Sequence, residues 1–234
     1  MDRFILLQKI IDTNRFKTYL EIGTFHGRSF FPLKCKNKIA VDPHFQFTEK
    51  NKRNWKLKNL CNIRNKYFEK TSDDFFNEEK AFLEKLGTID LIFIDGLHTF
   101  QASLSDALNA LKYISIDGFI VMHDCYPPHN AAAKPAKNLR EAETMNLPGW
   151  TGEWCGDVWK TIVYLKEKYG NDLKIHTLNT DYGLGIIQIK NPDLDLKIDQ
   201  ELFDRIDRFK YEEVNNKFSR LLNLKEVHEL NLIL

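Results

Sequence analysis

Short runs of apolar, β-branched residues alternate along this chain with stretches in which apolar residues recur every three or four positions. The short runs predict strands, and the helical spacing predicts amphipathic helices. Two of the runs are almost continuously apolar, which is typical of strands that are covered on both faces. Seven strands are expected, at residues 18–22, 38–41, 63–68, 89–94, 119–122, 173–178 and 183–189.

Helices are predicted between these strands. Residues 72–86 carry apolar side chains on one face and end at Gly87, and residues 99–114 and 158–169 show the same spacing. Because strands and helices alternate, right-handed crossovers and a parallel sheet with helices on both sides are expected. The pattern predicts a doubly wound α/β fold.

The last two predicted strands break the parallel arrangement. Only residues 179–182 separate them, which is too short for a crossover, so we expect an antiparallel hairpin. A mostly parallel seven-stranded sheet with a reversed last strand is not the layout of a nicotinamide dehydrogenase.

A helical pattern returns after the hairpin. Apolar side chains share a face at residues 202–209 and again at 214–222. We therefore expect residues 1–190 to form one domain and residues 191–234 a helical appendage. Its apolar faces pack either on that domain or on a second subunit, as a homodimer, and the sequence does not choose between the two.

Composition narrows the class of protein. Of the 234 residues, 43% are hydrophobic, which is sufficient for a folded core. The 34 Lys and Arg balance the 33 Asp and Glu, so charge gives no reason to expect a nucleic acid or an anionic membrane as partner. No run approaches the roughly 18 apolar residues of a membrane span. The four cysteines form no C-x-x-C pair and no signal peptide is evident, so a cytoplasmic location is expected.

The segment after the first strand carries the first functional signal. An acid, Glu21, is followed by Gly23 and Gly27 in the spacing E-x-G-x-x-x-G. Gly23 permits a turn with positive φ and a close approach of a ligand, and Gly27 lets the helix expected after it lie close to the strand. The spacing differs from the G-x-G-x-x-G that binds a pyrophosphate, and an acid in this place suits a cationic ligand better.

The second strand ends in another acid, Asp42, about 20 residues after the glycine loop. An acid at this place can accept hydrogen bonds from ribose hydroxyls. A nucleoside with a positively charged tail and no phosphate is S-adenosylmethionine, which becomes the expected cofactor.

The chain resembles the class I S-adenosylmethionine-dependent methyltransferases over about residues 1–190. The resemblance rests on E-I-G-T-F-H-G, V-D-P, the strand order and the reversed hairpin. It implies that the glycine loop holds the methionine moiety, that the acid after the second strand binds the ribose, and that the residues after the third strand border the adenine. The implied cofactor-binding residues are Glu21, Gly23, Thr24, Gly27, Asp42, Thr71, Ser72, Asp73 and Asp95. The alternative, a strand–helix turn without a ligand, does not require an acid.

Two further acids are expected near this loop. The fourth strand runs into Asp95 and then His98, and the fifth runs into His123 and Asp124. Because the carboxyl ends of neighbouring strands meet at one edge, Asp95 and Asp124 can hold a divalent cation there. His98 can remove a proton from a substrate hydroxyl. Alternatively, Asp124 only caps a strand and His98 only begins a helix.

The D-G-x-H pattern at residues 95–98, followed by an acid after the fifth strand, resembles the macrocin-type, metal-dependent enzymes that O-methylate sugars on antibiotics. The resemblance implies Asp95 and Asp124 as magnesium ligands and His98 as the base. The chain departs from that subgroup because His123 stands where a Glu is expected. Imidazole is a poor magnesium ligand, so either another divalent metal such as Mn²⁺ binds, with His123 among its ligands, or no metal does.

Residues 125–156 contain few helix or strand signals and several prolines, as is typical of a binding loop. Aromatic residues of such a loop can stack on a sugar or a planar substrate. The candidate substrate-binding residues here are His123, Tyr126, Trp150 and Trp154. Trp159, just beyond, is more typical of a core position.

A basic run with an aromatic residue, at residues 50–58, is compatible with binding to a phosphate backbone. The balanced charge favours the alternative, a solvated helix face with Trp55 and Leu57 turned at least partly inward.

The sequence thus predicts a methyltransferase that acts on a hydroxyl of a small polar substrate, by resemblance a sugar, a glycoconjugate precursor or a related metabolite. Three alternatives stay open: methylation of a nucleic acid, a non-catalytic subunit that binds S-adenosylmethionine, and a related oxygenase-like branch of the family.

Overall fold

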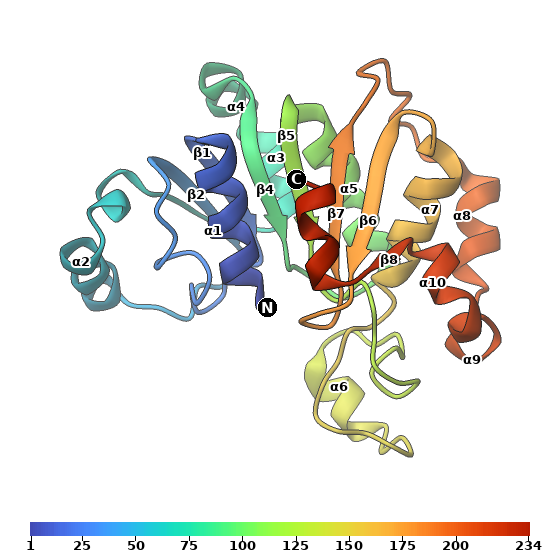
Figure 1. The fold of residues 1–234 in the computed structure, drawn as a ribbon. Helices are drawn as coiled ribbons and strands as arrows, with labels where there is room; N and C mark the ends of the chain where they lie inside the picture. Colours follow the sequence, from blue (N-terminus) through green and yellow to red (C-terminus); the bar gives the residue numbers. More distant parts are fainter.

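A twisted sheet with helices on both faces forms the body of the molecule, and the computed structural model describes all of residues 1–234 (Figure 1). The strand order is β3-β2-β1-β4-β5-β7-β6-β8, and only β7 runs opposite to the others. The predicted α/β class and the reversed hairpin are confirmed. The strands are β1 Thr18–Ile22, β2 Asn37–Asp42, β3 Lys66–Glu69, β4 Ile89–Ile94, β5 Ile114–Met122, β6 Leu173–Leu178, β7 Leu184–Ile189 and β8 Leu224–Lys225.

The helices divide between the two faces of the sheet. α1 covers one face, and α3, α5 and α7 cover the other (Figure 1). The helices are α1 Arg3–Asn14, α2 Glu49–Lys58, α3 Ser72–Glu78, α4 Lys80–Leu86, α5 Phe100–Tyr113, α6 Leu139–Thr144, α7 Trp159–Tyr169, α8 Gln200–Asp207, α9 Tyr211–Val214 and α10 Phe218–Leu221. Short 3₁₀ turns span Leu60–Arg64, Asn215–Lys217 and Val227–Leu232. None of these helices is long and apolar enough to pass through a lipid bilayer.

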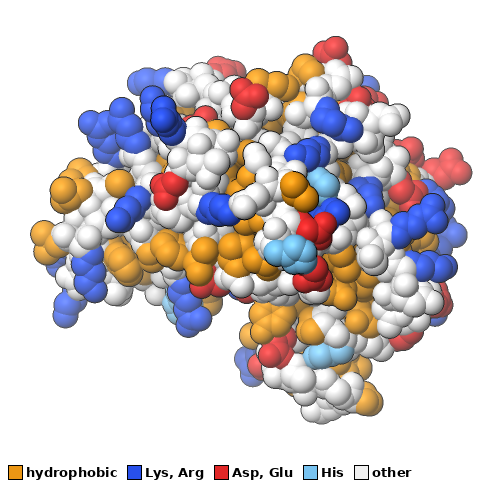
Figure 2. Space-filling model, viewed as in Figure 1, with side chains coloured by type: hydrophobic (Ala, Val, Ile, Leu, Met, Phe, Trp, Pro, Cys, Tyr) orange, Lys and Arg blue, Asp and Glu red, His pale blue; other side chains and the backbone are white.

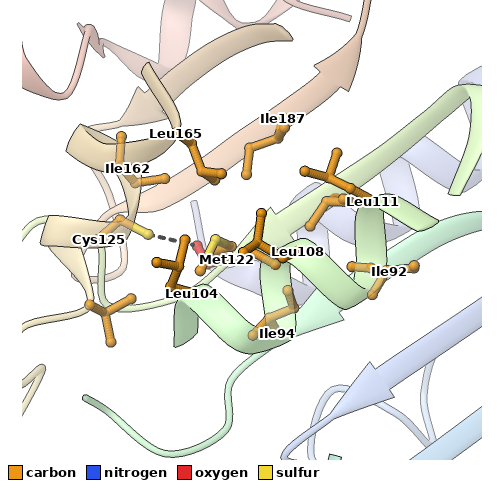
Figure 3. Close-up of a cluster of buried hydrophobic side chains, with 14 of the residues drawn as sticks. Ile92, Ile94, Leu104, Leu108, Leu111, Met122, Cys125, Ile162, Leu165 and Ile187 are labelled. Carbon is orange, nitrogen blue, oxygen red and sulfur yellow. Dashed lines mark hydrogen bonds between the residues drawn. The ribbon is translucent and has the colours of Figure 1, made fainter. Parts of the chain in front are cut away.

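The larger core lies between the sheet and helices α5 and α7. Leu104 and Leu108 of α5 meet Ile162 and Leu165 of α7 over Ile187 of β7 (Figure 3). Each of these side chains is buried, as the helical spacing of their segments predicted. This packing fixes the strands whose tips carry the site.

Residues after the hairpin also belong to the core. Ile206, Phe218 and Leu222 pack in the larger core, while Leu230 and Ile233 pack on the face covered by α1. The apolar faces of the predicted appendage thus pack on the body of the same chain. The two-residue strand β8, beside β6, is an addition that the sequence pattern did not predict.

The helix expected after Gly27 does not form, and residues 25–36 run through turns instead. The physical reason is Lys38, which is buried in β2. Its Nζ donates to the carbonyl oxygens of Phe30 at 2.6 Å and Leu33 at 2.8 Å and to Oδ1 of Asn62 at 2.7 Å. Because these carbonyls point at a buried amine, they do not accept from the N–H groups of a helix.

Other boundaries also differ from the expectation. The strand expected at residues 63–68 begins at Lys66, because a 3₁₀ turn occupies residues 60–64. The helix expected at residues 72–86 is interrupted at Glu79. In α2, the ring of Trp55 packs inward, stacked on that of Phe31, but Leu57 is 84% exposed rather than turned inward.

Candidate active site

The tips of several strands meet at one edge of the sheet, which is the lower edge in Figure 1. β1, β2, β4 and β5 end there, and so does β6, which places the turn of the β6–β7 hairpin beside them. The loop between β5 and α7 projects below this edge as a separate lobe (Figure 2). Ligands of parallel α/β sheets bind at this end of the strands.

The glycine loop packs directly on the residue that follows β4. Gly23 has φ +81°, and a Cβ atom added there would lie 1.8 Å from the carbonyl oxygen of Asp95. Gly27 has φ +69°, and an added Cβ would lie 2.5 Å from the ring of Phe31. Only glycine therefore permits this turn and this close approach of the two loops.

Glu21 lies beneath the glycine loop. Its carboxylate is buried and accepts hydrogen bonds from the hydroxyls of Tyr19 and Ser29, the latter at 2.9 Å. Burial raises the pKa of Glu21 to about 8, against the opposing effect of these two donors. The side chain therefore supports the loop from below. A direct contact with a cationic ligand stays a prediction.

Asp42 ties the tip of β2 to the same loop. Its Oδ2 accepts from the backbone N–H of Phe25 at 2.7 Å and its Oδ1 accepts from that of His44 at 2.8 Å. Burial raises the pKa of Asp42 even though both N–H groups favour the carboxylate. Thr24, also buried, donates from its hydroxyl to the carbonyl oxygen of Glu21 at 3.2 Å.

The three residues predicted to border the adenine begin α3. The hydroxyl of Thr71 caps this helix, Ser72 follows it, and Oδ1 of Asp73 accepts from the Ser105 hydroxyl at 2.8 Å. Sequence reasoning missed Asp106, a buried acid of α5 beside Ser72. The sequence feature that could have identified Asp106 is an acid on the otherwise apolar face of a predicted helix.

Four predicted side chains come together at the tips of β4 and β5. Oδ2 of Asp124 lies 2.9 Å from Nδ1 of His123 and 3.1 Å from Nε2 of His98. Oδ1 of Asp95 lies 3.3 Å from Nδ1 of His123 and 3.6 Å from Nε2 of His98. Asp95, His98 and Asp124 each offer a donor atom within 4.8 Å of the others, which is compact enough for a metal ion. We call Asp95, His98, His123 and Asp124 the acid–imidazole cluster.

The two imidazoles of this cluster have different surroundings. Nδ1 of His98 lies 2.8 Å from the carbonyl oxygen of Trp154, so this nitrogen carries the proton and Nε2 faces the carboxylates. His123 is only 5% exposed, and neither of its ring nitrogens makes a hydrogen bond. Asp124, with φ +60°, holds a backbone conformation that is strained for a residue with a side chain.

Charge within the cluster shifts its titration. Burial lowers the pKa of His98, but the carboxylates of Asp124 and Asp95 outweigh burial and raise it to about 9. The pKa of His123 is likewise raised by the same two carboxylates against burial. Burial acts to raise the pKa of Asp95, yet His123, His98 and Arg3 hold it well below its usual range.

Sequence reasoning missed two charged residues of this site. Nη1 of Arg3 lies 2.6 Å from Oδ2 of Asp95, and its Nε lies 3.0 Å from Oδ2 of Asp181. Asp181 also lies 3.4 Å from Nε2 of His123. The sequence could have indicated Asp181, because the predicted hairpin turn had to lie at the carboxyl edge of the sheet. No pattern in the sequence placed Arg3 near this edge.

The predicted substrate residues are not all at the cluster. Trp154 is, since its ring lies 4.9 Å from that of His98 and its carbonyl oxygen contacts the same imidazole. The ring of Tyr126 instead faces Phe218 of α10 at 6.0 Å. Trp150 lies farther along the projecting loop, in a turn closed on Leu147.

Comparison with known proteins finds similarity to methyltransferases in part of the chain. Residues 20–125 match a family model described as a methyltransferase domain. An uncharacterized protein of Acanthamoeba polyphaga mimivirus is 34% identical over 117 residues, which are 46% of this chain and 51% of that protein. The chain thus spans about half the length of this curated relative.

Solved structures show the same fold. An O-methyltransferase from Streptomyces achromogenes, TomG, solved with S-adenosylmethionine, has a TM-score of 0.56 at 14% identity and covers 80% of this chain and 79% of its own. An O-methyltransferase from Bacillus cereus, solved with S-adenosylhomocysteine, has a TM-score of 0.53 at 19% identity and covers 80% of each chain. The fold that the resemblance implied is confirmed, and residues 20–125 are similar to a methyltransferase domain.

Proposed function

We propose that this protein, whose residues 20–125 match a methyltransferase-domain model, uses S-adenosylmethionine to methylate a hydroxyl of a small polar substrate in the cytoplasm. The observation that carries the proposal is the position of the acid–imidazole cluster directly against the glycine loop. Because Gly23 packs on the backbone of Asp95, a proton acceptor and the loop expected to hold the cofactor share one strand edge.

The residues around the glycine loop suit the cofactor. Gly23, Thr24 and Gly27 would hold the methionine moiety, and Asp42 would bind the ribose. The carboxylate of Asp42 is fixed by two backbone N–H groups, and each oxygen keeps a lone pair for a ribose hydroxyl. Glu21 contributes by fixing Ser29 beneath the loop. When bound, the cofactor supplies a methyl group already activated by its sulfonium.

Thr71, Ser72 and Asp73 would border the adenine. This proposal rests on the position of the three residues, which follow β3 at the same edge of the sheet. The hydrogen bond between Asp73 and Ser105 holds α3 against α5.

His98 is the proposed base. The bond between its Nδ1 and Trp154 leaves Nε2 without a hydrogen bond and turned toward the carboxylates. Because the same carboxylates raise the pKa of His98 to about 9, only its unprotonated fraction can accept the proton of the substrate hydroxyl at Nε2 near neutral pH. The resulting imidazolium is stabilised by Asp124 and Asp95. Methyl transfer forms the oxygen–carbon bond and breaks the carbon–sulfur bond, so the chain itself contributes orientation and proton removal.

A sugar or a related metabolite is the proposed acceptor. The D-G-x-H pattern supports this class by resemblance, and Trp154 offers an aromatic surface beside the base. The near-balanced charge of 34 Lys and Arg against 33 Asp and Glu disfavours a nucleic acid.

The test replaces the proposed base and measures two quantities separately. With His98→Ala and His98→Gln, we expect turnover in a screen of sugars and nucleotide sugars to fall by about 100-fold or more. The affinity for S-adenosylmethionine, measured by calorimetry, should change by less than about threefold, because the base acts on the acceptor. His228→Ala, at an exposed histidine, is the matched control.

Equal losses of turnover and of cofactor affinity would remove His98 from the role of base. If the wild type bound the cofactor but turned over none of the acceptors, the non-catalytic alternative would stand instead. No binding of the cofactor at millimolar concentration would overturn the whole proposal.

A further inference from the structure

His123 is buried among carboxylates, and neither of its ring nitrogens makes a hydrogen bond. Its Nδ1 lies 2.9 Å from Oδ2 of Asp124 and 3.3 Å from Oδ1 of Asp95, but neither contact has the geometry of a hydrogen bond. A buried imidazole in this state is unusual, because buried polar groups are normally satisfied.

These separations match those of neighbouring ligands on one metal ion. Two ligand atoms that each lie about 2.1 Å from a metal are ~3.0 Å apart at a right angle and ~3.4 Å apart at a tetrahedral angle. The two distances from Nδ1 of His123, 2.9 and 3.3 Å, lie close to these two values. A cation on the lone pair of Nδ1 would satisfy the imidazole and both carboxylates together.

Groups behind the cluster fix the orientation of its donors. Arg3 binds the outer oxygen of Asp95 at 2.6 Å, which leaves the inner oxygen facing His123. The strained backbone of Asp124 turns its carboxylate toward the same point. Supporting contacts of this kind, which hold each ligand from behind, are a general property of metal sites.

We propose that Asp95, His123 and Asp124 bind a divalent transition metal in preference to Mg²⁺, and that His123 sets this preference. Magnesium demands oxygen ligands, whereas a nitrogen among carboxylates suits Mn²⁺, Co²⁺ or Zn²⁺. The magnesium site expected by resemblance does not fit the residues present, because an imidazole stands in the place of a carboxylate. The purpose of the metal, to orient the acceptor hydroxyl, rests on the proposed function, but its binding does not.

The experiment measures metal binding without cofactor or substrate. The full-length protein, freed of metal by a chelator, is titrated with Co²⁺, and the visible absorption of the bound ion is recorded. Its melting temperature is measured with Mn²⁺, Co²⁺, Zn²⁺ and Mg²⁺. We expect Co²⁺ bands typical of a nitrogen ligand, stabilisation by the three transition metals, and affinity for Mg²⁺ at least tenfold weaker than for Co²⁺.

Two substitutions of His123 test its role. His123→Glu restores the carboxylate of the resembling subgroup, so it should weaken Co²⁺ binding at least tenfold and create Mg²⁺ binding. His123→Gln should weaken both, and circular dichroism checks that each variant folds. His228→Glu, which adds the same charge at an exposed position, should leave metal binding unchanged.

Three results would overturn the inference: no stabilisation by any metal, equal affinity of the wild type for Mg²⁺ and Co²⁺, or an unchanged preference in His123→Glu. Each is obtained in the absence of methyl transfer. A failure of the proposed function would instead appear as absent cofactor binding or turnover while the metal results hold.

Discussion

Asp106 carries a carboxyl group on the apolar face of α5, where it is only 3% exposed. Burial raises its pKa to about 7 from an ordinary value of 3.8. In the folded protein the group keeps a proton that the unfolded chain releases above about pH 4. The free energy of unfolding therefore falls as the pH rises from about 4 to about 7, and it stays lower above that.

Asp106→Asn removes this titration. The variant is expected to be more stable than the wild type at pH 8, by at most about 4 kcal/mol at ~1.4 kcal/mol per pKa unit, and by less at pH 5. Urea denaturation at both values measures the difference. Asp204→Asn, at an exposed acid of α8, serves as control. A stability difference between Asp106→Asn and the wild type that does not change with pH would contradict the argument.

The sequence was informative about side chains that follow strands directly. Asp95, His98, His123 and Asp124 were predicted to meet because neighbouring parallel strands end at one edge. Arg3 could not be found in this way, because its helix approaches the site from a part of the chain with no fixed relation to the strand tips.

The glycine loop is the element on which the cofactor proposal depends, and Gly23→Ala tests it. An added Cβ meets the carbonyl oxygen of Asp95 at 1.8 Å, in addition to the cost of a left-handed φ. Gly87→Ala is a matched control, since its φ is +80° but nothing lies within 4 Å of an added Cβ.

We expect Gly87→Ala to lose about 1–3 kcal/mol of stability in urea denaturation, because φ +80° with ψ −140° is a backbone conformation that residues other than glycine rarely adopt. Gly23→Ala should lose at least about 2 kcal/mol more and should bind S-adenosylmethionine more weakly, because the two loops must separate. Similar losses in the two variants would mean that the contact with Asp95 does not matter.

Elements with strong periodicity were predictable, and their ends were less so. β1, β4 and β6 have the bounds that alternation and apolar runs predicted. The missing helix after Gly27 was not predictable from local pattern, because it depends on a side chain from the next strand. Lys38 withdraws the carbonyls of that segment from any helix, and its effect exists only once β2 lies beneath them.

The C-terminal segment is part of the core of the whole molecule. Phe218 is 2% exposed, and its ring lies 5.1 Å from that of Trp159 in α7 and 5.4 Å from that of Tyr211. Phe218→Ala should therefore reduce the free energy of unfolding by about 3–5 kcal/mol.

The same measurement on Leu232→Ala, at a side chain that is 81% exposed, should show a change within about 0.5 kcal/mol. If Phe218→Ala changed the free energy of unfolding as little as Leu232→Ala does, the C-terminal segment would not stabilise the body of the protein.

The parallel direction of the first strands followed from strand–helix alternation, and the reversed hairpin followed from its short connection. The packing partner of residues 191–234 could not be predicted, because the pattern of an amphipathic helix shows which face is buried but not which surface covers it. The two-residue β8 is too short to leave a pattern in the sequence.

Arg3 and Asp181 bind each other beside the acid–imidazole cluster, yet neither belongs to the stretch that matches the methyltransferase domain. Domain boundaries taken from that match would therefore leave out part of the candidate active site. A fragment trimmed to residues 20–125 would lack the guanidinium behind Asp95, the acid beside His123 and the tryptophan carbonyl on His98. Such a fragment would keep the glycine loop but would lose the groups that contact the acid–imidazole cluster from outside the matched stretch.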